Sequence, residues 1–335
     1  LLGLVTTGYT YLGGMTAVLW TDLMQLIVYT CGSVTAAFFL VDLIPGGWNE
    51  VVATASDNGK LQIFDFTWDI QLSYTFWSGL IGGTCLTIAT HGTDQLMVQR
   101  YLCSRSARDA GKALLWSGAI VMTQFLLFLA IGVMLYVYHT QYNPEGLVPL
   151  SVNGSLQLDR IFPTFVVTQL PSGLRGLMVA SIFASAMSTL SSSLNSSASS
   201  SLADFHLPYA KRRPPTSHHL IFARRATIIW GLIQILVAFV AINFSSVVVN
   251  EVLGIASFTN GLILGIFLLG IGGYRRHSTA YTGAIVGANV MLAVRLLTTI
   301  SWQWYVLIGA SVTLATGCLT DRLSNKRIPN LGNVH

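Results

Sequence analysis

The sequence predicts an all-α polytopic membrane protein, because it is strongly apolar, carries little charge and keeps its charges in clusters. The chain has 335 residues, of which 53% are hydrophobic and 9% are charged, whereas a soluble domain has about 25% charged residues. The clustering leaves eight uncharged runs, each near or above the roughly 20 residues that a helix needs to cross a bilayer. The runs cover residues 1–21, 23–41, 70–93, 113–144, 176–203, 226–250, 252–274 and 296–320. An ordinary water-soluble globule is therefore excluded.

From these runs we expect about nine transmembrane helices. Their predicted ranges are 1–19, 21–44, 70–96, 113–138, 172–204, 222–244, 249–273, 279–299 and 302–320. The break between the first two predicted helices has the least support, because their apolar runs are nearly continuous. An apolar run starts at Leu1 with no basic region before it, so we expect no signal peptide and a fragment cut inside a helix. A transmembrane domain over residues 1–320 and a cytoplasmic tail over 321–335 are predicted.

The basic residues predict the orientation of these helices. Fourteen of the 18 Lys and Arg residues lie in four alternate connections or tails. They are Arg100, Arg105, Arg108, Lys112, Lys211, Arg212, Arg213, Arg224, Arg225, Arg275, Arg276, Arg322, Lys326 and Arg327. Cytoplasmic loops are enriched in such residues, so we expect an integral protein of the plasma membrane with a cytoplasmic C-terminus. This segregation also explains the net charge of +5 through anionic lipid headgroups, and no nucleic-acid partner is expected.

Enzymatic and zinc-binding motifs are absent from the sequence. The four cysteines lie in or beside apolar runs without paired spacing, so neither a disulfide framework nor a zinc site is indicated. There is no nucleophile–base pair and no motif such as HExxH. We therefore do not expect an enzyme.

The fifth predicted helix is unusually rich in hydroxyl groups. Helical spacing places Ser181, Ser185, Ser188 and Ser192 on one face. One interpretation is close helix packing, with each hydroxyl bonded to the carbonyl one turn earlier. The other is an ion site, since the adjacent hydroxyls of Ser188 and Thr189 and freed backbone carbonyls could bind a hard cation such as sodium.

The inner half of the third predicted helix is too polar to face hydrocarbon. Its polar side chains are Thr87, Thr90, His91, Asp94 and Gln95. An unsatisfied backbone group in lipid costs several kcal/mol, so this segment must line a cavity or be unwound, and such interruptions point to binding sites. A structural histidine at His91 and an interfacial ion pair between Asp94 and Arg100 are the alternatives.

The later helices carry two further patterns. The seventh begins with a polar stretch, Asn250–Gly261, which is a second candidate discontinuity, although the helix dipole alone would favour Glu251 at a helix start. Small residues repeat at helical spacing in Gly261 with Gly265 and in a second pair, at positions 283 and 287. Such pairs predict close helix contact.

Four stretches of the chain together resemble the sodium:solute symporter family, which includes sodium/glucose, monocarboxylate, multivitamin and proline transporters. These stretches are Tyr11–Gln25, Asp94–Leu102, Gly173–Ser196 and Trp304–Thr313. The resemblance runs along nearly the whole chain. It implies a partial fold of five plus five inverted-repeat helices, from the end of core helix 4 through core helix 10, plus two peripheral helices.

The resemblance also implies a function, which is sodium-coupled symport of a small organic solute by alternating access. It implies that the backbone carbonyl of Ser185 and the hydroxyls of Ser188 and Thr189 are sodium ligands, completed by a first core helix outside this chain. A transporter-fold sensor that binds its solute without coupled flux, as in relatives fused to kinase domains, is the alternative.

The solute contacts match the sugar-transporting members poorly. Those members have Asn and Tyr where this chain has Thr87 and Thr90, a Gln in place of Leu253 and a Lys in place of Val121. The resemblance therefore favours a small organic acid over a sugar, with the polar residues of the third helix as the cavity-lining candidates.

Overall fold

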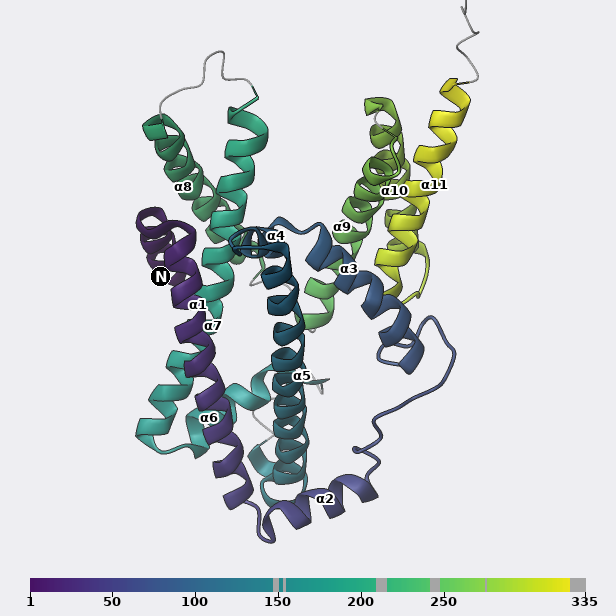
Figure 1. Cartoon of the computed structure of the whole chain (residues 1–335). Coiled ribbons are helices and arrows are strands. Elements are labelled where there is room, and N and C mark those ends of the chain that lie inside the picture. Colours follow the sequence, from purple (N-terminus) through teal and green to yellow (C-terminus); the bar gives the residue numbers. More distant parts are fainter. Residues whose placement is uncertain (147–150, 153–154, 209–215, 242–247, 275, 326–335) are drawn as a thin grey trace, which may run out of the picture. The chain divides into compact units, whose positions relative to one another are not determined.

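The computed structural model is almost entirely helical over the residues that it describes (Figure 1). Those residues are 1–146, 151–152, 155–208, 216–241, 248–274 and 276–325. Its two strands, β1 (Ser151–Val152) and β2 (Ser155–Leu156), form a short antiparallel pair. The predicted all-α class is thus confirmed. Six of the basic residues used to predict the orientation, Lys211, Arg212, Arg213, Arg275, Lys326 and Arg327, lie outside the described residues.

The chain divides into two compact units. The first unit comprises residues 1–61 and 99–245, and the second comprises residues 62–98 and 246–335. Helix α4 (Gln95–Leu102) contains the point at which the chain passes from the second unit into the first.

The first unit is built on four long helices. They are α1 (Leu2–Asp42), α5 (Ala107–Val137), α7 (Ser172–Ser201) and α8 (Thr216–Ala241). Its shorter elements are α2 (Gly47–Asp57), α6 (Ile161–Gln169), the π-helices η2 (Tyr138–Tyr142) and η5 (Leu202–His206), and the 3₁₀ helix η4 (Leu158–Arg160). Figure 1 shows α1 running beside α7. The two approach closely at Gly32, where an added Cβ would lie 2.6 Å from Ser181 Oγ.

The predicted break near residue 20 is wrong, because α1 is continuous from Leu2 to Asp42. The polar residues there do not need a break. Thr21 Oγ1 donates to the carbonyl of Val18 at 2.9 Å, and Asp22 is hydrogen-bonded to α7. No Gly or Pro stands between residues 18 and 24 to interrupt the helix.

The second unit packs α9 (Val248–Ile271), α10 (His277–Leu297) and α11 (Tyr305–Asn325) through small residues. An added Cβ at Gly261 would lie 3.0 Å from the carbonyl oxygen of Tyr305, and one at Gly265 would lie 2.5 Å from Thr313 Cβ. Gly283 and Gly287 also face Thr313. The predicted close contacts at both glycine pairs are confirmed, and they let the helix backbones approach.

The predicted discontinuity in the seventh helix is wrong, since α9 is continuous across Asn250–Gly261. Two of its polar side chains are satisfied, one within the helix and one by a neighbouring helix. Thr259 Oγ1 donates to the carbonyl of Ile255 at 2.6 Å, and Glu251 Oε2 lies 2.7 Å from Arg295 Nη2.

The third predicted helix starts later than expected and is interrupted as expected. Residues 70–75 are not helical, because Thr75 caps the helix: Ser78 N donates to Thr75 Oγ1 at 3.2 Å, and Thr75 N donates to Ser78 Oγ at 3.0 Å. A π-helix, η1 (Ser78–Gly83), follows and leads into α3 (Thr84–Gly92), which ends before α4. Irregular turns of this kind are frequent at functional sites.

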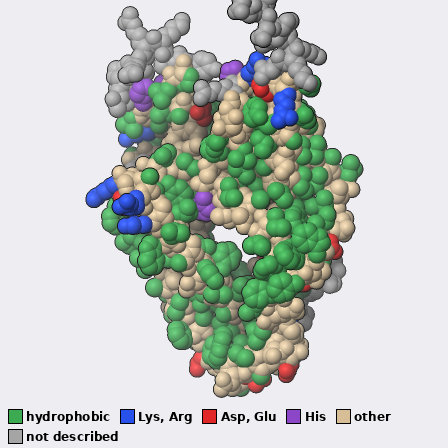
Figure 2. Space-filling view, turned by 45° about the vertical axis from the view of Figure 1, so that its right-hand side comes forward, with side chains coloured by type: hydrophobic (Ala, Val, Ile, Leu, Met, Phe, Trp, Pro, Cys, Tyr) green, Lys and Arg blue, Asp and Glu red, His purple; other side chains and the backbone are tan. Residues whose placement is uncertain are grey.

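Seven helices among the described residues are long and apolar enough to cross a membrane. They are Val18–Asp42, Ala107–Tyr142, Ser172–His206, His218–Val240, Val249–Ile271, His277–Leu297 and Trp302–Ser324. The count is lower than the predicted nine because α1 is one helix and the segment before α4 is divided. Hydrophobic side chains cover much of the face shown in Figure 2. The chain is an integral membrane protein.

Candidate cation and solute sites

A carboxylate on α1 forms the centre of a polar cluster in the first unit. Asp22 accepts hydrogen bonds from Ser188 Oγ at 2.6 Å and from Ser192 Oγ at 3.4 Å, both on α7. Arg100 Nη2 lies 2.8 Å from Asp22 Oδ2 and also donates to Ser192 Oγ. The Arg100 and Asp22 side chains are only 27% and 18% exposed, so the ion pair is only partly screened by water.

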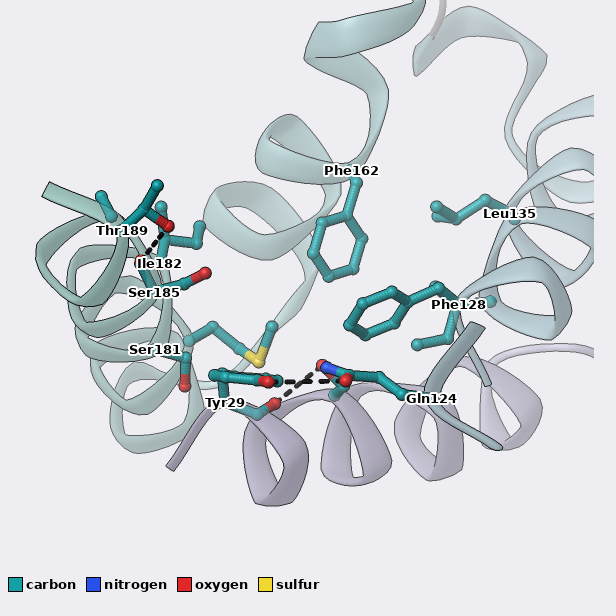
Figure 3. Close-up of a pocket in the computed structure, with 14 residues that line it drawn as sticks. Tyr29, Gln124, Phe128, Leu135, Phe162, Ser181, Ile182, Ser185 and Thr189 are labelled. Atoms are coloured by element: carbon teal, nitrogen blue, oxygen red, sulfur yellow. Dashed lines mark hydrogen bonds between the residues drawn. The ribbon is translucent and has the colours of Figure 1, made fainter. Parts of the chain in front are cut away.

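Ser185 and Thr189 lie on α7 beside Ser188 but face a different neighbour. Successive helical residues are about 100° apart around the axis, so Ser188 meets α1 while Thr189 lines a cavity of about 640 Å³ with Ser185 (Figure 3). Thr189 Oγ1 donates to the carbonyl of Ser185 at 3.3 Å. Of the three predicted sodium ligands, Ser188 therefore contacts the Asp22 carboxylate, while Ser185 and Thr189 face the cavity.

The cavity is mainly apolar, with a few polar groups at its edges. Figure 3 shows Tyr29 and Gln124 facing each other across one side, where Tyr29 Oη lies 3.4 Å from Gln124 Oε1. Rings of Phe128 and Phe162 occupy the side away from Thr189. Its volume is within the usual range of small-ligand sites, about 300–1,000 Å³.

The hydroxyl stripe on α7 makes two kinds of contact at different positions. Ser181, which is 2% exposed, donates to the carbonyls of Leu177 and Val28 at 2.8 and 3.2 Å. This is the packing interpretation, and it is confirmed for Ser181. The hydroxyl of Ser188 is directed to a carboxylate instead, which is the kind of oxygen ligand set that hard cations prefer.

Asp22 is the residue of this cluster that is not among the predicted site residues. A signal for it was present, since Asp22 is the only charged residue between positions 1 and 41. Ionisable groups inside membrane segments are costly and usually functional. Because Asp22 separates two uncharged runs, hydropathy alone predicts a helix boundary there and places Asp22 outside the membrane.

The predicted solute-contact residues lie in the second unit, on both sides of the helix break. Thr87 is exposed on α3 and its hydroxyl donates to the carbonyl of Gly83 at 2.8 Å. Helical spacing puts Thr90 and His91, both half-buried, on the same face as Thr87. Asp94 follows the break and its Oδ1 accepts from Leu96 N at 2.9 Å.

The two residues after the break belong to the start of α4. The carboxylate of Asp94 caps the first turn of that helix, and Gln95 is the exposed first residue of α4. Arg100, considered as a partner for Asp94, is placed against Asp22. The structure thus brings Thr87, Thr90 and His91 together on α3 and separates them from Gln95 by the break.

Comparison with known proteins identifies the family. The sequence profile of the sodium:solute symporter family matches residues 1–293. The chain belongs to this family. It is 29% identical over 326 residues to the sodium/sialic acid symporter SiaT of Proteus mirabilis, covering 96% of this chain and 64% of that protein. It is 30% identical to sodium-coupled monocarboxylate transporter 2 of Danio rerio, covering 86% of this chain and 45% of that protein.

The fold has a close counterpart among solved structures. A substrate-bound, outward-open Na⁺-coupled sialic acid symporter superimposes with a TM-score of 0.82 at 29% identity, covering 96% of this chain and 65% of that chain. The resemblance inferred from the four sequence stretches is confirmed. The chain spans just under two thirds of the length of SiaT and of the solved symporter.

Proposed function

We propose that the protein is a sodium-coupled symporter that imports a small organic solute by alternating access. The observation that carries this proposal is the Asp22 carboxylate held 2.6 Å from the Ser188 hydroxyl between two membrane-spanning helices. Family membership and the sodium coupling of the relatives support it.

The proposed sodium site consists of the Ser185 carbonyl and the hydroxyls of Ser188 and Thr189. These are neutral oxygen ligands, and the nearby charge of Asp22 would raise the local affinity for a cation. In this structure Arg100 neutralises that carboxylate. Sodium is cargo here, and each ion moved inward gains roughly 2.3 kcal/mol per 100 mV of membrane potential.

We further propose that the solute contacts Thr87, Thr90, His91, Asp94 and Gln95. A small organic acid is favoured over a neutral sugar, because the Asn, Tyr, Gln and Lys of the sugar-transporting members are replaced. The names of the two relatives, a sialic acid symporter and a monocarboxylate transporter, agree with an acidic solute. Uptake competition in which neutral sugars outcompete small organic acids would contradict this part.

The placement in the cell is also proposed. We assign the protein to the plasma membrane with its C-terminus in the cytoplasm, on the distribution of Lys and Arg. Residues 1–320 are proposed to form the transport domain and 321–335 the tail.

The test is solute-panel uptake into proteoliposomes with an inward sodium gradient, repeated with potassium in place of sodium. Accumulation of one solute with sodium alone would support symport. Equal uptake with either cation would overturn the coupling.

A further inference from the structure

The segment ahead of η1 has an exposed, regularly spaced apolar side. We call residues 62–77 of the second unit the aromatic loop. Its side chains alternate between apolar and polar in the order Phe64, Asp65, Phe66, Thr67, Trp68, Asp69, Ile70, Gln71, Leu72, Ser73 and Tyr74. The loop is not helical before Phe76. Phe66 and Trp68 are 62% and 63% exposed, and Ile63 is 85% exposed. Exposed apolar surfaces of this kind mark sites that bind protein, lipid or another ligand.

Ring contacts join the aromatic loop to the start of a membrane span. The ring centroids of Phe66 and Phe76 are 4.9 Å apart, and those of Trp68 and Trp304 are 6.2 Å apart. Tyr74 stacks edge-on with Trp302 at 6.3 Å. Trp302 and Trp304 form the short 3₁₀ helix η6 (Trp302–Trp304) that leads into α11. Ring contacts therefore connect the loop to a helix end, where Trp304 itself is buried.

Hydrogen bonds fix the position of the aromatic loop relative to two of the candidate membrane spans. Ser301 N donates to the carbonyl of Ile70 at 3.0 Å, and Tyr74 Oη donates to Asn250 Oδ1 at 2.7 Å. Ser301 directly precedes the span Trp302–Ser324, and Asn250 is the second residue of the span Val249–Ile271. The loop is thus tied to the ends of two spans, at the level where Trp and Tyr settle between water and hydrocarbon.

We propose that the aromatic loop lies in the interfacial zone of the bilayer and binds lipid through its apolar side chains. The aliphatic side chains of the loop favour lipid over a soluble ligand such as a sugar. Ile70 and Leu72, which are 43% and 45% exposed, add nothing to stacking on a sugar ring but gain free energy when lipid covers them.

The polar side of the aromatic loop is occupied by its own turns. Asp65 Oδ1 accepts from Thr67 N at 2.9 Å, and Asp69 Oδ1 accepts from Gln71 N at 2.8 Å. The loop contains no Lys or Arg. Its attachment to lipid is therefore apolar, and it does not depend on anionic headgroups or on salt, unlike the attachment of a basic segment.

This anchor has a structural consequence for the helix that follows. The reciprocal hydrogen bonds of Thr75 and Ser78 connect the end of the aromatic loop to η1, and η1 continues into α3. Lipid contact would hold this end of the interrupted helix at a fixed depth in the membrane.

The test is site-directed spin labelling of the reconstituted protein, with Cys31, Cys85, Cys103 and Cys318 replaced by serine. Single cysteines at Phe66 and Trp68 probe the apolar side, and matched controls at Thr67 and Gln71 probe the polar side. Collision rates with oxygen, which is concentrated in lipid, and with a water-soluble nickel chelate are compared. We expect a several-fold higher oxygen-to-nickel ratio at the two apolar positions than at the controls.

Two further conditions separate lipid from other partners. The ratios should be unchanged when phosphatidylcholine vesicles are supplemented with phosphatidylglycerol or when salt is raised. Equal, nickel-dominated ratios at all four positions would place the aromatic loop in water and overturn the proposal. Immobilisation of the labels at Phe66 and Trp68 only when a transported solute is added would also overturn it, in favour of a solute vestibule.

Discussion

Removing the hydroxyl of Ser188 is expected to weaken sodium binding strongly. In the structure this hydroxyl lies 2.6 Å from the Asp22 carboxylate, and a hydrogen bond to a charged group contributes about 1.5–3 kcal/mol. When sodium binds, the Ser188 hydroxyl oxygen would contact the ion. We take this ion–dipole contact to be of similar strength to the hydrogen bond. At about 1.4 kcal/mol per factor of ten, Ser188→Ala should raise the sodium half-saturation about ten- to hundredfold.

The assay is solute uptake at a fixed, saturating solute concentration with a titration of external sodium. Ser181→Ala is the matched control, because Ser181 is on the same helix and its hydroxyl is bonded to the carbonyls of Leu177 and Val28. The control should leave the sodium half-saturation nearly unchanged. An unchanged half-saturation in Ser188→Ala, or equal shifts in both variants, would refute the assignment.

Three other substitutions test the site and the packing. Asp22→Asn keeps the shape of the side chain but removes its charge, so sodium-dependent uptake should be largely lost; full activity with normal sodium dependence would show that the charge is dispensable. Thr87→Val should raise the solute KM without changing the sodium half-saturation. Thr84→Val removes a hydroxyl with the same kind of i−4 bond at a position outside the proposed solute contacts, and it should change neither; equal effects would argue against a solute contact. Gly265→Val overpacks α9 against α11 and should cost about 1–3 kcal/mol of stability, seen as a lower Tm, while Gly270→Val has open space and should not; similar Tm values would contradict the packing.

The helix positions could be predicted because membrane spans need long apolar runs. α10 spans His277–Leu297 against a predicted 279–299. The errors fall where local hydrogen bonds decide the outcome. The reciprocal capping by Thr75 and Ser78 delays a helix that hydropathy alone begins at residue 70. Helix α1 continues through Thr21 and Asp22, whose side chains are hydrogen-bonded within the helix and to α7.

Only the part of the candidate site on α7 could be predicted, because α7 carries the hydroxyl-rich pattern. The hydroxyl-rich pattern around Ser188 predicts a site there, but its hydrogen-bond partner Asp22 lies 166 residues away. No periodicity links two such positions. The ion pair of Asp22 with Arg100 likewise joins residues 78 positions apart, so the polar cluster required the fold.

The most direct test of the central claim is the parallel measurement of tracer sodium and tracer solute influx in the same proteoliposomes. Coupled symport predicts that adding solute starts sodium influx and that the two fluxes keep a constant ratio as the solute concentration changes. Solute binding without influx of either species, or sodium influx that is independent of solute, would contradict it.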